Sequence, residues 1–406
     1  MTGAAVGQCP CMALPRVLVL VLAGGAGSRL ELLTERRAKA AVPFAAEYRL
    51  VDFPLSNCRH AHLPDVWVSV QFHPASLAEH LANGRPWDLD RSTGGLMTLV
   101  PFRGSGREGW HSGTADSLWR NAGLIRAFDA DALVVVSADA VYRLDYREVV
   151  DAHLEGGGEV TMVTTRVDPA DASRYGVVRV GEGDRVEDYA SKPDEPASDV
   201  VTNEVFVFTP GAVLDRLDAI AAEDGEEGLA DLGDRLLPDL TRDGAARAFP
   251  FDGYWRDVGT VEAYWRAHQD FVSPEPPVDL DDPAWPVLTR GGRHSAARLL
   301  PGAEVDGSLI GSGTHVAGRV RGSVLSPGVV VEPGATLVDS VLLPGARVRA
   351  GATVTRAVLD DGVDVGDGAT VGGGDGDIAL VGRRARVQPG ATVAPGGRLP
   401  EPEQGR

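Results

Sequence analysis

The sequence has 406 residues, 43% of them apolar, so the chain can bury a sizeable core and has room for two or three domains. Its 58 acidic and 39 basic residues give a net charge of −19, which disfavours nucleic acids and anionic membranes as partners. An anionic ligand must therefore be bound by a few well-placed cations, and no apolar stretch is long enough for a transmembrane helix.

The N-terminal segment contains Cys9 and Cys11, and the third cysteine is Cys58. Three cysteines are too few for a disulfide framework, which favours a reducing, cytoplasmic location. The Cys9-Pro10-Cys11 sequence could bind a metal or act in redox chemistry, but no second pair lies near it. We therefore predict that residues 1–14 form a disordered tail.

Residues 15–270 alternate short apolar, β-branched runs with helix-like segments. This alternation predicts an α/β domain with a mostly parallel sheet covered on both faces. Strands are expected at Val17–Leu22, Val66–Val70, Ala132–Ser137, Glu159–Thr165 and Val205–Thr209. The first run could also belong to a signal peptide, but it is short and only one cation precedes it, so a buried strand entering a glycine loop explains it better.

The character of the chain changes after this region. Three prolines between Phe271 and Pro277 cannot continue a helix or pair in a central strand, so residues 271–290 are predicted to be a linker.

Residues 291–400 carry a hexapeptide repeat. Aliphatic residues recur at every sixth position, and paired glycines such as Gly328 and Gly334 keep the same step. The aliphatic positions are Leu325, Val331, Leu337, Leu343, Leu359, Val365, Val371, Val381, Val387, Val393 and Leu399. Three hexads to a coil build a parallel β-helix in which the aliphatic side chains stack inside and the glycines allow the corners.

A glycine loop follows the first predicted strand, with Gly24, Gly25, Gly27 and Ser28. Glycines after a buried strand let backbone N–H groups approach a phosphate, and the start of the next helix adds its positive dipole. The spacing is neither that of a dinucleotide fold nor that of a Walker loop, and a merely tight turn is the alternative. Behind the loop, Arg36, Arg37 and Lys39 could compensate a triphosphate or could form a solvated helix face.

Lysine usage favours the first interpretation. Of the 39 basic residues only Lys39 and Lys192 are lysines, so arginine was accepted almost everywhere else. A compact ammonium can enter a crowded phosphate site that a planar guanidinium cannot. We therefore expect both lysines in the active site, although they could also be chance remnants on the surface.

Several motifs resemble bacterial glucose-1-phosphate adenylyltransferase. They are Leu22–Leu30, Arg37–Lys39, Tyr48–Asn57, Gly113–Asp116, Asp139–Tyr142 and Tyr254–Thr260, together with the β-helix. The resemblance covers nearly the whole chain after Pro15 and implies a Rossmann-like nucleotidyltransferase domain followed by a left-handed parallel β-helix. It also implies adenylyl transfer from ATP to glucose 1-phosphate, with release of pyrophosphate, for the synthesis of glycogen-type α-glucan.

The resemblance further implies roles for individual residues. Arg29, Lys39 and Asp139 would be catalytic. The nucleotide would be bound by Gly24, Gly25, Gly27, Ser28, Gln71, Gly113 and Thr114. The sugar phosphate would be bound by Gly176, Lys192, Thr202, Asp231 and Trp255, with Lys192 on its phosphate. Asp139 and Asp257 would hold Mg²⁺, because a hard cation on carboxylate oxygens offsets the repulsion between two phosphates, and no protein nucleophile is needed.

Four departures from the family pattern concern the sugar side and the segment after Lys39. Lys39 is followed by Ala40 rather than proline, and Ala45-Ala46 replaces a glycine pair. Ser191 stands where the family has an acidic residue before its sugar-site lysine. Thr202-Asn203-Glu204 replaces Ser-Met-Gly, with Phe206 in place of a tyrosine. These changes bear on the identity of the sugar.

The resemblance also implies a homotetramer and an anionic metabolite effector bound by basic residues between the domains. Arg36, Arg37, Arg383 and Arg384 are the candidates for that site.

Alternatives to this reading are a nucleotidylyltransferase for another nucleotide or sugar 1-phosphate, and a non-catalytic regulatory paralogue, which Ser191 and Glu204 motivate. A bifunctional enzyme with an acyltransferase β-helix is less favoured, because that chemistry needs a histidine base and, after His294, the helix offers only His315 near its start.

Overall fold

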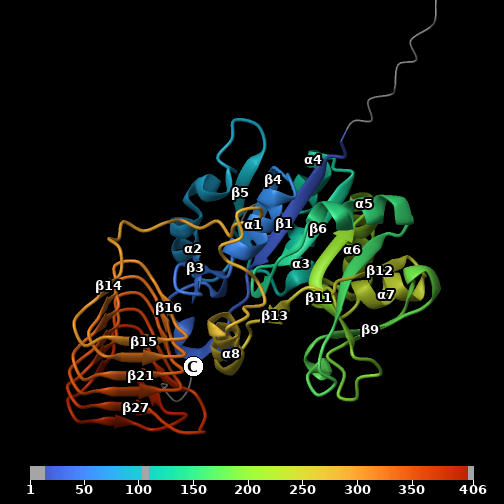
Figure 1. The fold of residues 1–406 in the computed structure, drawn as a ribbon. Coiled ribbons are helices and arrows are strands. Elements are labelled where there is room, and N and C mark those ends of the chain that lie inside the picture. Colours follow the sequence, from blue (N-terminus) through green and yellow to red (C-terminus); the bar gives the residue numbers. More distant parts are fainter. Residues whose placement is uncertain (1–13, 103–108, 401–406) are drawn as a thin grey trace, which may run out of the picture.

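The computed structural model describes residues 14–102 and 109–400, which form an α/β domain followed by a β-helix (Figure 1). The predictions for Cys9, Cys11 and the tail of residues 1–13 lie outside the described residues. Within the described ranges, no helix combines the length and the apolar character needed to cross a bilayer.

The α/β domain is built on one large mixed sheet with the strand order β10-β9-β11-β6-β1-β4-β5, in which β8 also pairs with β11 and β12 pairs with β8. The strands are β1 Val17–Ala23, β4 Asp65–Val70, β5 Gly95–Leu99, β6 Ala132–Ser137, β8 Val160–Arg166, β9 Gly176–Val180, β10 Val186–Ser191, β11 Val200–Phe208 and β12 Ala246–Pro250. Strands β6, β1, β4 and β5 are parallel; the first three are predicted strands, and β5 was not predicted.

The other part of the sheet differs from the expected parallel arrangement. Strand β11 runs antiparallel to both β6 and β8, and it contains most of the predicted strand Val205–Thr209. A continuous apolar run reports burial on both faces of a strand but not its direction, so the sequence pattern could not reveal this reversal.

Both faces of the sheet are buried by helices. On β1, Val17, Val19 and Val21 join one core cluster, while Leu18 and Leu20 join another on the opposite face. The helices are α1 Asp52–His60, α2 Pro74–Leu81, α3 Thr114–Arg120, α4 Ala122–Phe128, α5 Tyr146–Gly156, α6 Pro210–Asp224, α7 Leu236–Arg242 and α8 Val261–Val272. This two-sided burial explains the unbroken apolar runs of the central strands.

The segment between α8 and the β-helix crosses the surface of the α/β domain. Residues 273–297 contain neither helix nor strand. The Leu288 backbone accepts a hydrogen bond from Trp87 Nε1 at 3.0 Å and donates one to Ser56 Oγ at 2.9 Å. The segment is therefore tied to the α/β domain.

The β-helix runs from β14 (Arg298–Leu299) to β31 (Arg398–Leu399) and consists of three parallel six-stranded sheets within the described chain. Leu325 pairs with Leu342 and then with Leu359, so successive central coils are seventeen residues apart. The prediction that Leu343 fills this stack was wrong. Because seventeen is one short of three hexads, Leu342 takes the inner position and Leu343 packs outward.

The outward-facing residues attach the β-helix to the α/β domain. Leu343 and Val358 join a core cluster that includes Trp265 and Phe271 of α8. Trp265 also donates from Nε1 to the Asp339 carbonyl at 2.7 Å.

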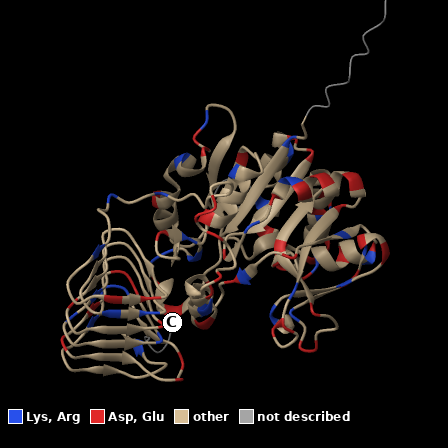
Figure 2. Ribbon diagram, viewed as in Figure 1, with Lys and Arg blue, Asp and Glu red and all other residues tan. Residues whose placement is uncertain are grey.

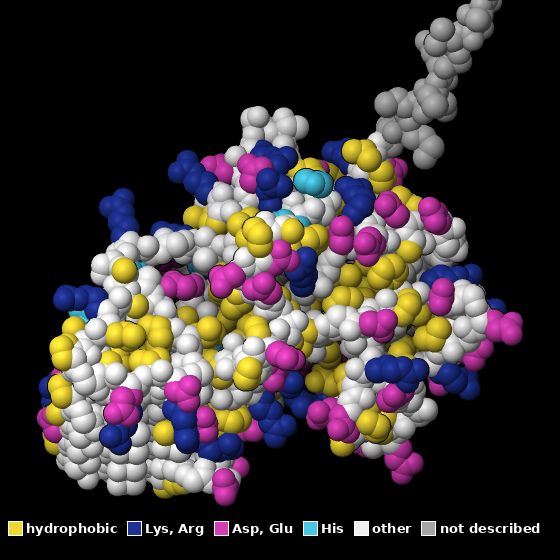
Figure 3. Space-filling model, viewed as in Figure 1, with side chains coloured by type: hydrophobic (Ala, Val, Ile, Leu, Met, Phe, Trp, Pro, Cys, Tyr) yellow, Lys and Arg dark blue, Asp and Glu magenta, His cyan; other side chains and the backbone are white. Residues whose placement is uncertain are grey.

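Most charged side chains lie on the outside of both parts of the molecule, although a few, such as Lys39, Asp52 and Asp360, are buried. The central strands are almost free of Lys, Arg, Asp and Glu (Figure 2), and on the face seen in Figure 3 basic and acidic side chains are interspersed. Neither view shows a basic stripe suited to a polyanion.

Candidate active site

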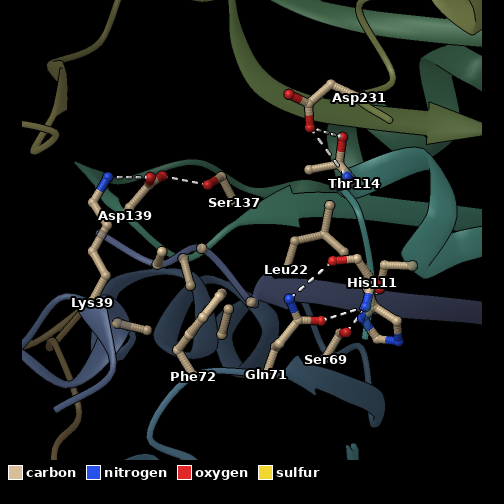
Figure 4. Close-up of a pocket in the computed structure, with 18 of the residues that line it drawn as sticks. Leu22, Lys39, Ser69, Gln71, Phe72, His111, Thr114, Ser137, Asp139 and Asp231 are labelled. Atoms are coloured by element: carbon tan, nitrogen blue, oxygen red, sulfur yellow. Dashed lines mark hydrogen bonds and ion pairs between the residues drawn. The ribbon is translucent and has the colours of Figure 1, made fainter. Parts of the chain in front are cut away.

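A cavity of about 430 Å³ lies at the carboxyl ends of the parallel strands, the usual ligand position in such sheets (Figure 4). It is lined by the loop after β1, by Gln71 and Phe72 after β4, and by Ser137 and Asp139 at and after the end of β6. We call it the nucleotide-side cavity.

A second cavity of about 480 Å³ lies beside the first, over β9, β10 and β11. Seven predicted site residues line it, namely Arg29, Thr114, Asp139, Gly176, Lys192, Thr202 and Asp231. We call it the sugar-side cavity. The residues that line both cavities are Leu22, Thr114, Ser137, Asp139, Glu204 and Asp231, so two ligands could meet there.

Lys39 lines the nucleotide-side cavity next to this junction and is almost completely buried. Its Nζ is 2.5 Å from Asp139 Oδ2 and 4.0 Å from Asp257 Oδ1. Burial acts to lower the pKa of Lys39, but Asp139 and Asp257 outweigh it, so the pKa lies above its ordinary value. Lys39 therefore stays charged.

The two carboxylates respond differently to that charge. Burial acts to raise the pKa of Asp139, but the close Lys39 ammonium outweighs it and the pKa is lowered. Burial and the charge of Asp139 raise the pKa of Asp257, which is farther from Lys39. Both carboxylates converge on one buried cation, as the ligands of a hard metal ion would.

Strand pairing explains why Asp257 reaches Asp139 from so far along the chain. Strand β13 (Trp255–Asp257) pairs with β7 (Ala140–Tyr142), and this register sets Asp257 opposite Ala140. The Val258 backbone N–H then donates to the Asp139 carbonyl at 3.0 Å. Ser137 Oγ donates to the Asp139 carboxylate and fixes its orientation.

The glycine loop divides into two parts. Gly24 and Gly25 line the nucleotide-side cavity, whereas Gly27 and Ser28 line neither cavity. Gly27 has φ 68°, and a Cβ there would lie 2.9 Å from Thr34 Cγ2 and 3.2 Å from Lys39 Cβ. Gly27 therefore shapes the turn that brings the loop against Lys39.

The polar groups predicted on the base and ribose side are already hydrogen-bonded. The Gln71 amide donates to the His111 carbonyl at 2.9 Å and accepts from the His111 N–H at 2.6 Å. Asp231 Oδ1 accepts from Thr114 N at 3.2 Å and from Thr114 Oγ1 at 3.1 Å (Figure 4). The Gln71 bonds fix the segment before α3, and the Thr114–Asp231 bonds fix two residues that line both cavities.

Lys192 contrasts with Lys39. It is exposed, has φ 46°, and its backbone N–H donates to the Tyr175 carbonyl at 3.0 Å. Trp255, expected at the sugar, does not line the cavity. Its ring packs edge-on against that of Tyr175, with the ring centroids 5.1 Å apart, and Tyr175 does not line the cavity either.

Two residues of the site were not predicted from the sequence, because neither belongs to a recognised motif: Ser137, which bonds Asp139, and Tyr189, which lines the sugar-side cavity. Glu204 was noted only as a departure from the family pattern. The Glu204 side chain is accessible to solvent, but only from within the cleft, where protein surrounds it on most sides. The resulting loss of hydration, together with the charge of Asp139, raises the pKa of Glu204 to about 7. The unusual carboxylate at a family glycine was the signal that could have placed it here.

The four predicted effector arginines also come together. Arg36, Arg37, Arg383 and Arg384 line a separate pocket of about 220 Å³ between the α/β domain and the β-helix. Arg37 bonds Asp360 at 2.5 Å and lies 3.3 Å from Asp361. Arg36 and Arg384 form no ion pair with the described residues, so their charge is available to a ligand.

The sequence matches the family model for nucleotidyl transferases over residues 18–273 and the GlmU-like C-terminal hexapeptide model over residues 298–390. It is 39% identical over 323 residues to the glucose-1-phosphate adenylyltransferase of Thermotoga neapolitana, covering 79% of this chain and 76% of that protein. It is 40% identical over 301 residues to the enzyme of the same name from Thermomicrobium roseum, covering 74% and 70%. Against that of Clostridioides difficile the identity is 35% over 325 residues, covering 80% and 84%.

Proposed function

Because the chain belongs to the glucose-1-phosphate adenylyltransferases, which are nucleotidyl transferases, we propose that it joins ATP and glucose 1-phosphate at the junction of its two cavities. The products are ADP-glucose and pyrophosphate. The observation that carries this proposal is the convergence of Asp139, which lines both cavities, and Asp257 on the buried Lys39.

ATP occupies the nucleotide-side cavity in this proposal. Gly24, Gly25 and Ala26 border the triphosphate with backbone N–H groups. The base and ribose contact Gln71, Gly113 and Thr114. Hydrogen bonds from Gln71 to His111 and from Thr114 to Asp231 hold this part of the cavity in place. Gly27 and Ser28 support the loop from behind.

Glucose 1-phosphate occupies the sugar-side cavity. Arg29 and Lys192 bind its phosphate, and Gly176, Thr202 and Asp231 border the sugar. Trp255 acts indirectly by supporting Tyr175.

The reaction needs no protein nucleophile. A phosphate oxygen of glucose 1-phosphate attacks the α-phosphorus, and the bond from that phosphorus to the pyrophosphate oxygen breaks. Lys39 stabilises the negative charge that accumulates on the transferred group and on pyrophosphate. Positioning of the two anions by Arg29, Lys39 and Lys192 contributes the rest.

Enzymes of this kind generally use Mg²⁺, and the residues present fit it. Asp139 and Asp257 offer carboxylate oxygens that already converge on a buried cation, Lys39. When bound there, Mg²⁺ would offset the charge of the phosphates and polarise the α-phosphate.

Two further proposals concern regulation and assembly. The pocket of Arg36, Arg37, Arg383 and Arg384 binds a small anionic metabolite, supported by the two arginines that lack a described ion pair. The paired variant Arg36→Ala/Arg384→Ala should lose any change in kcat or KM caused by phosphorylated sugars and keep its basal turnover. The enzyme acts as a cytoplasmic homotetramer, which light scattering after size-exclusion chromatography can test.

The central test is pyrophosphate release across ATP, UTP, GTP and dTTP with a panel of sugar 1-phosphates. We expect the largest kcat/KM with ATP and glucose 1-phosphate. Release with no pair of substrates would contradict the proposal and favour a regulatory paralogue.

A further inference from the structure

Glu204 occupies a position that the local backbone disfavours. Strand β11 pairs with β8 from Val200 to Thr202 and again from Phe206 to Phe208, with a shift of register between them. Glu204 lies inside that irregularity and has φ 60°, a region that side chains with a Cβ rarely adopt. Such strain tends to persist at positions with a function.

The irregularity turns Glu204 into the active-site cleft. Its neighbours Thr202, Asn203 and Val205 are buried, whereas Glu204 is exposed and lines both cavities. The side chain is therefore presented to substrate.

Acidic side chains outnumber basic ones around the sugar-side cavity. Arg29 and Lys192 are its two cations, and together they match a phosphate dianion. Asp139 is paired with Lys39, Asp231 accepts two hydrogen bonds from Thr114, and Asp234 accepts one from the Asp231 N–H. Among the described residues, Glu204 forms no ion pair within 4.0 Å, so its carboxyl group is available to a ligand.

We propose that Glu204 determines sugar specificity and that it binds the ammonium group of an amino sugar 1-phosphate, which makes that class of sugar a further substrate. Opposite a neutral sugar, the carboxylate would add repulsion to a phosphate dianion. Opposite an ammonium it forms a charge-assisted hydrogen bond, and the ammonium offsets part of the acidic excess of the cavity. The reaction is unchanged, since a phosphate oxygen of the amino sugar 1-phosphate bonds to the α-phosphorus and pyrophosphate leaves.

This inference rests on the proposed function, and its test compares three sugars at pH 7 with ATP and Mg²⁺. The sugars are glucose 1-phosphate, glucosamine 1-phosphate and N-acetylglucosamine 1-phosphate, of which only the second carries an ammonium. The readout is kcat/KM for pyrophosphate release in the wild type and in the Glu204→Gln and Glu204→Gly variants. Asp184→Gly is the matched control, because Asp184 is an exposed acid with φ 56° that lines neither cavity.

We expect the wild type to use glucosamine 1-phosphate, and both Glu204 variants to lose about tenfold to a hundredfold of kcat/KM for that sugar. Use of glucose 1-phosphate should stay within a few-fold or improve in Glu204→Gly, and Asp184→Gly should resemble the wild type with every sugar. Glycine accepts the local φ, so this variant should fold.

The inference is overturned if the wild type uses glucose 1-phosphate but not glucosamine 1-phosphate. It is also overturned if both variants change the use of the two sugars by the same factor, since Glu204 would then be a general positioning residue. Failure of the proposed function is distinguishable, because no sugar would then release pyrophosphate.

Discussion

The nucleotide-side and sugar-side cavities adjoin, yet each contains a lysine in a different setting. Lys39 is almost fully buried and bonded to Asp139, whereas Lys192 is exposed. The buried lysine has one fixed geometry, and the exposed one can adapt to its ligand. We infer that the nucleotide side is built for one reaction and that the sugar side is the part open to change.

The largest effect is expected for Asp139→Asn, because Asp139 lines both cavities. The substitution removes the close partner of Lys39 and one carboxylate of the proposed metal site. We expect kcat to fall about a thousandfold with either substrate varied. Steady-state pyrophosphate release measures it, and Asp129→Asn on the surface is the control. A loss under tenfold would mean that the cavities do not share a catalytic centre.

A smaller loss is expected for Lys39→Arg. The charge is kept, but the planar guanidinium is larger than the ammonium and must fit between Asp139 and the Gly27 turn. We expect kcat to fall about a hundredfold, with circular dichroism and melting temperature close to the wild type. Unchanged kcat would show that the buried lysine was retained by chance.

Lys192→Arg should have a weaker effect, and on binding more than on turnover. An exposed arginine can still reach a phosphate, so we expect KM for glucose 1-phosphate to rise about tenfold while KM for ATP stays constant. Initial rates at varied concentrations of each substrate separate the two constants. If KM for ATP rose instead, Lys192 would belong to the nucleotide side.

The parts of the fold that could be predicted follow from local patterns. The parallel strands β1, β4 and β6 were predicted because unbroken apolar runs report two-sided burial. The β-helix was predicted because its core repeats along the chain. The direction of β11 and the outward turn of Leu343 were not predictable, since they depend on which strand pairs with which and on a coil of seventeen residues.

The candidate site divides in the same way. The motifs that resemble the family contain Lys39, Asp139 and Asp257, and the structure brings the three together. Trp255 and the Gln71 amide are turned to other partners, because tertiary contacts decide where a side chain points. The sequence identified Glu204 only as a departure from the family motif. The direction of its side chain depends on the shift of register in β11, which the sequence does not reveal.

The smallest effect concerns stability, and it compares two buried histidines, His268 on α8 and His153 on α5. Burial lowers the pKa of both His268 and His153 to about 4. His268 Nδ1 donates to the Tyr264 carbonyl and Nε2 accepts from the Ala45 N–H, so a second ring proton would face a donor. Both nitrogens of His153 face threonine hydroxyls, which can rotate.

The pH dependence follows from these contacts. Above pH 6.5 both histidines are neutral in the folded and unfolded states, and their full contribution to stability is present. Between pH 6.5 and 4 each histidine is protonated in the unfolded state but stays neutral in the folded state. The free energy of unfolding therefore falls as pH falls, by up to about 1.4 kcal/mol per pH unit for each group. Because the two pKa values are lowered equally, urea unfolding at several pH values should show that His268→Gln and His153→Gln each reduce this slope by a similar amount. A slope that stays at the wild-type value in His153→Gln, but falls in His268→Gln, would show that the rotating threonine hydroxyls accommodate the charged imidazole of His153.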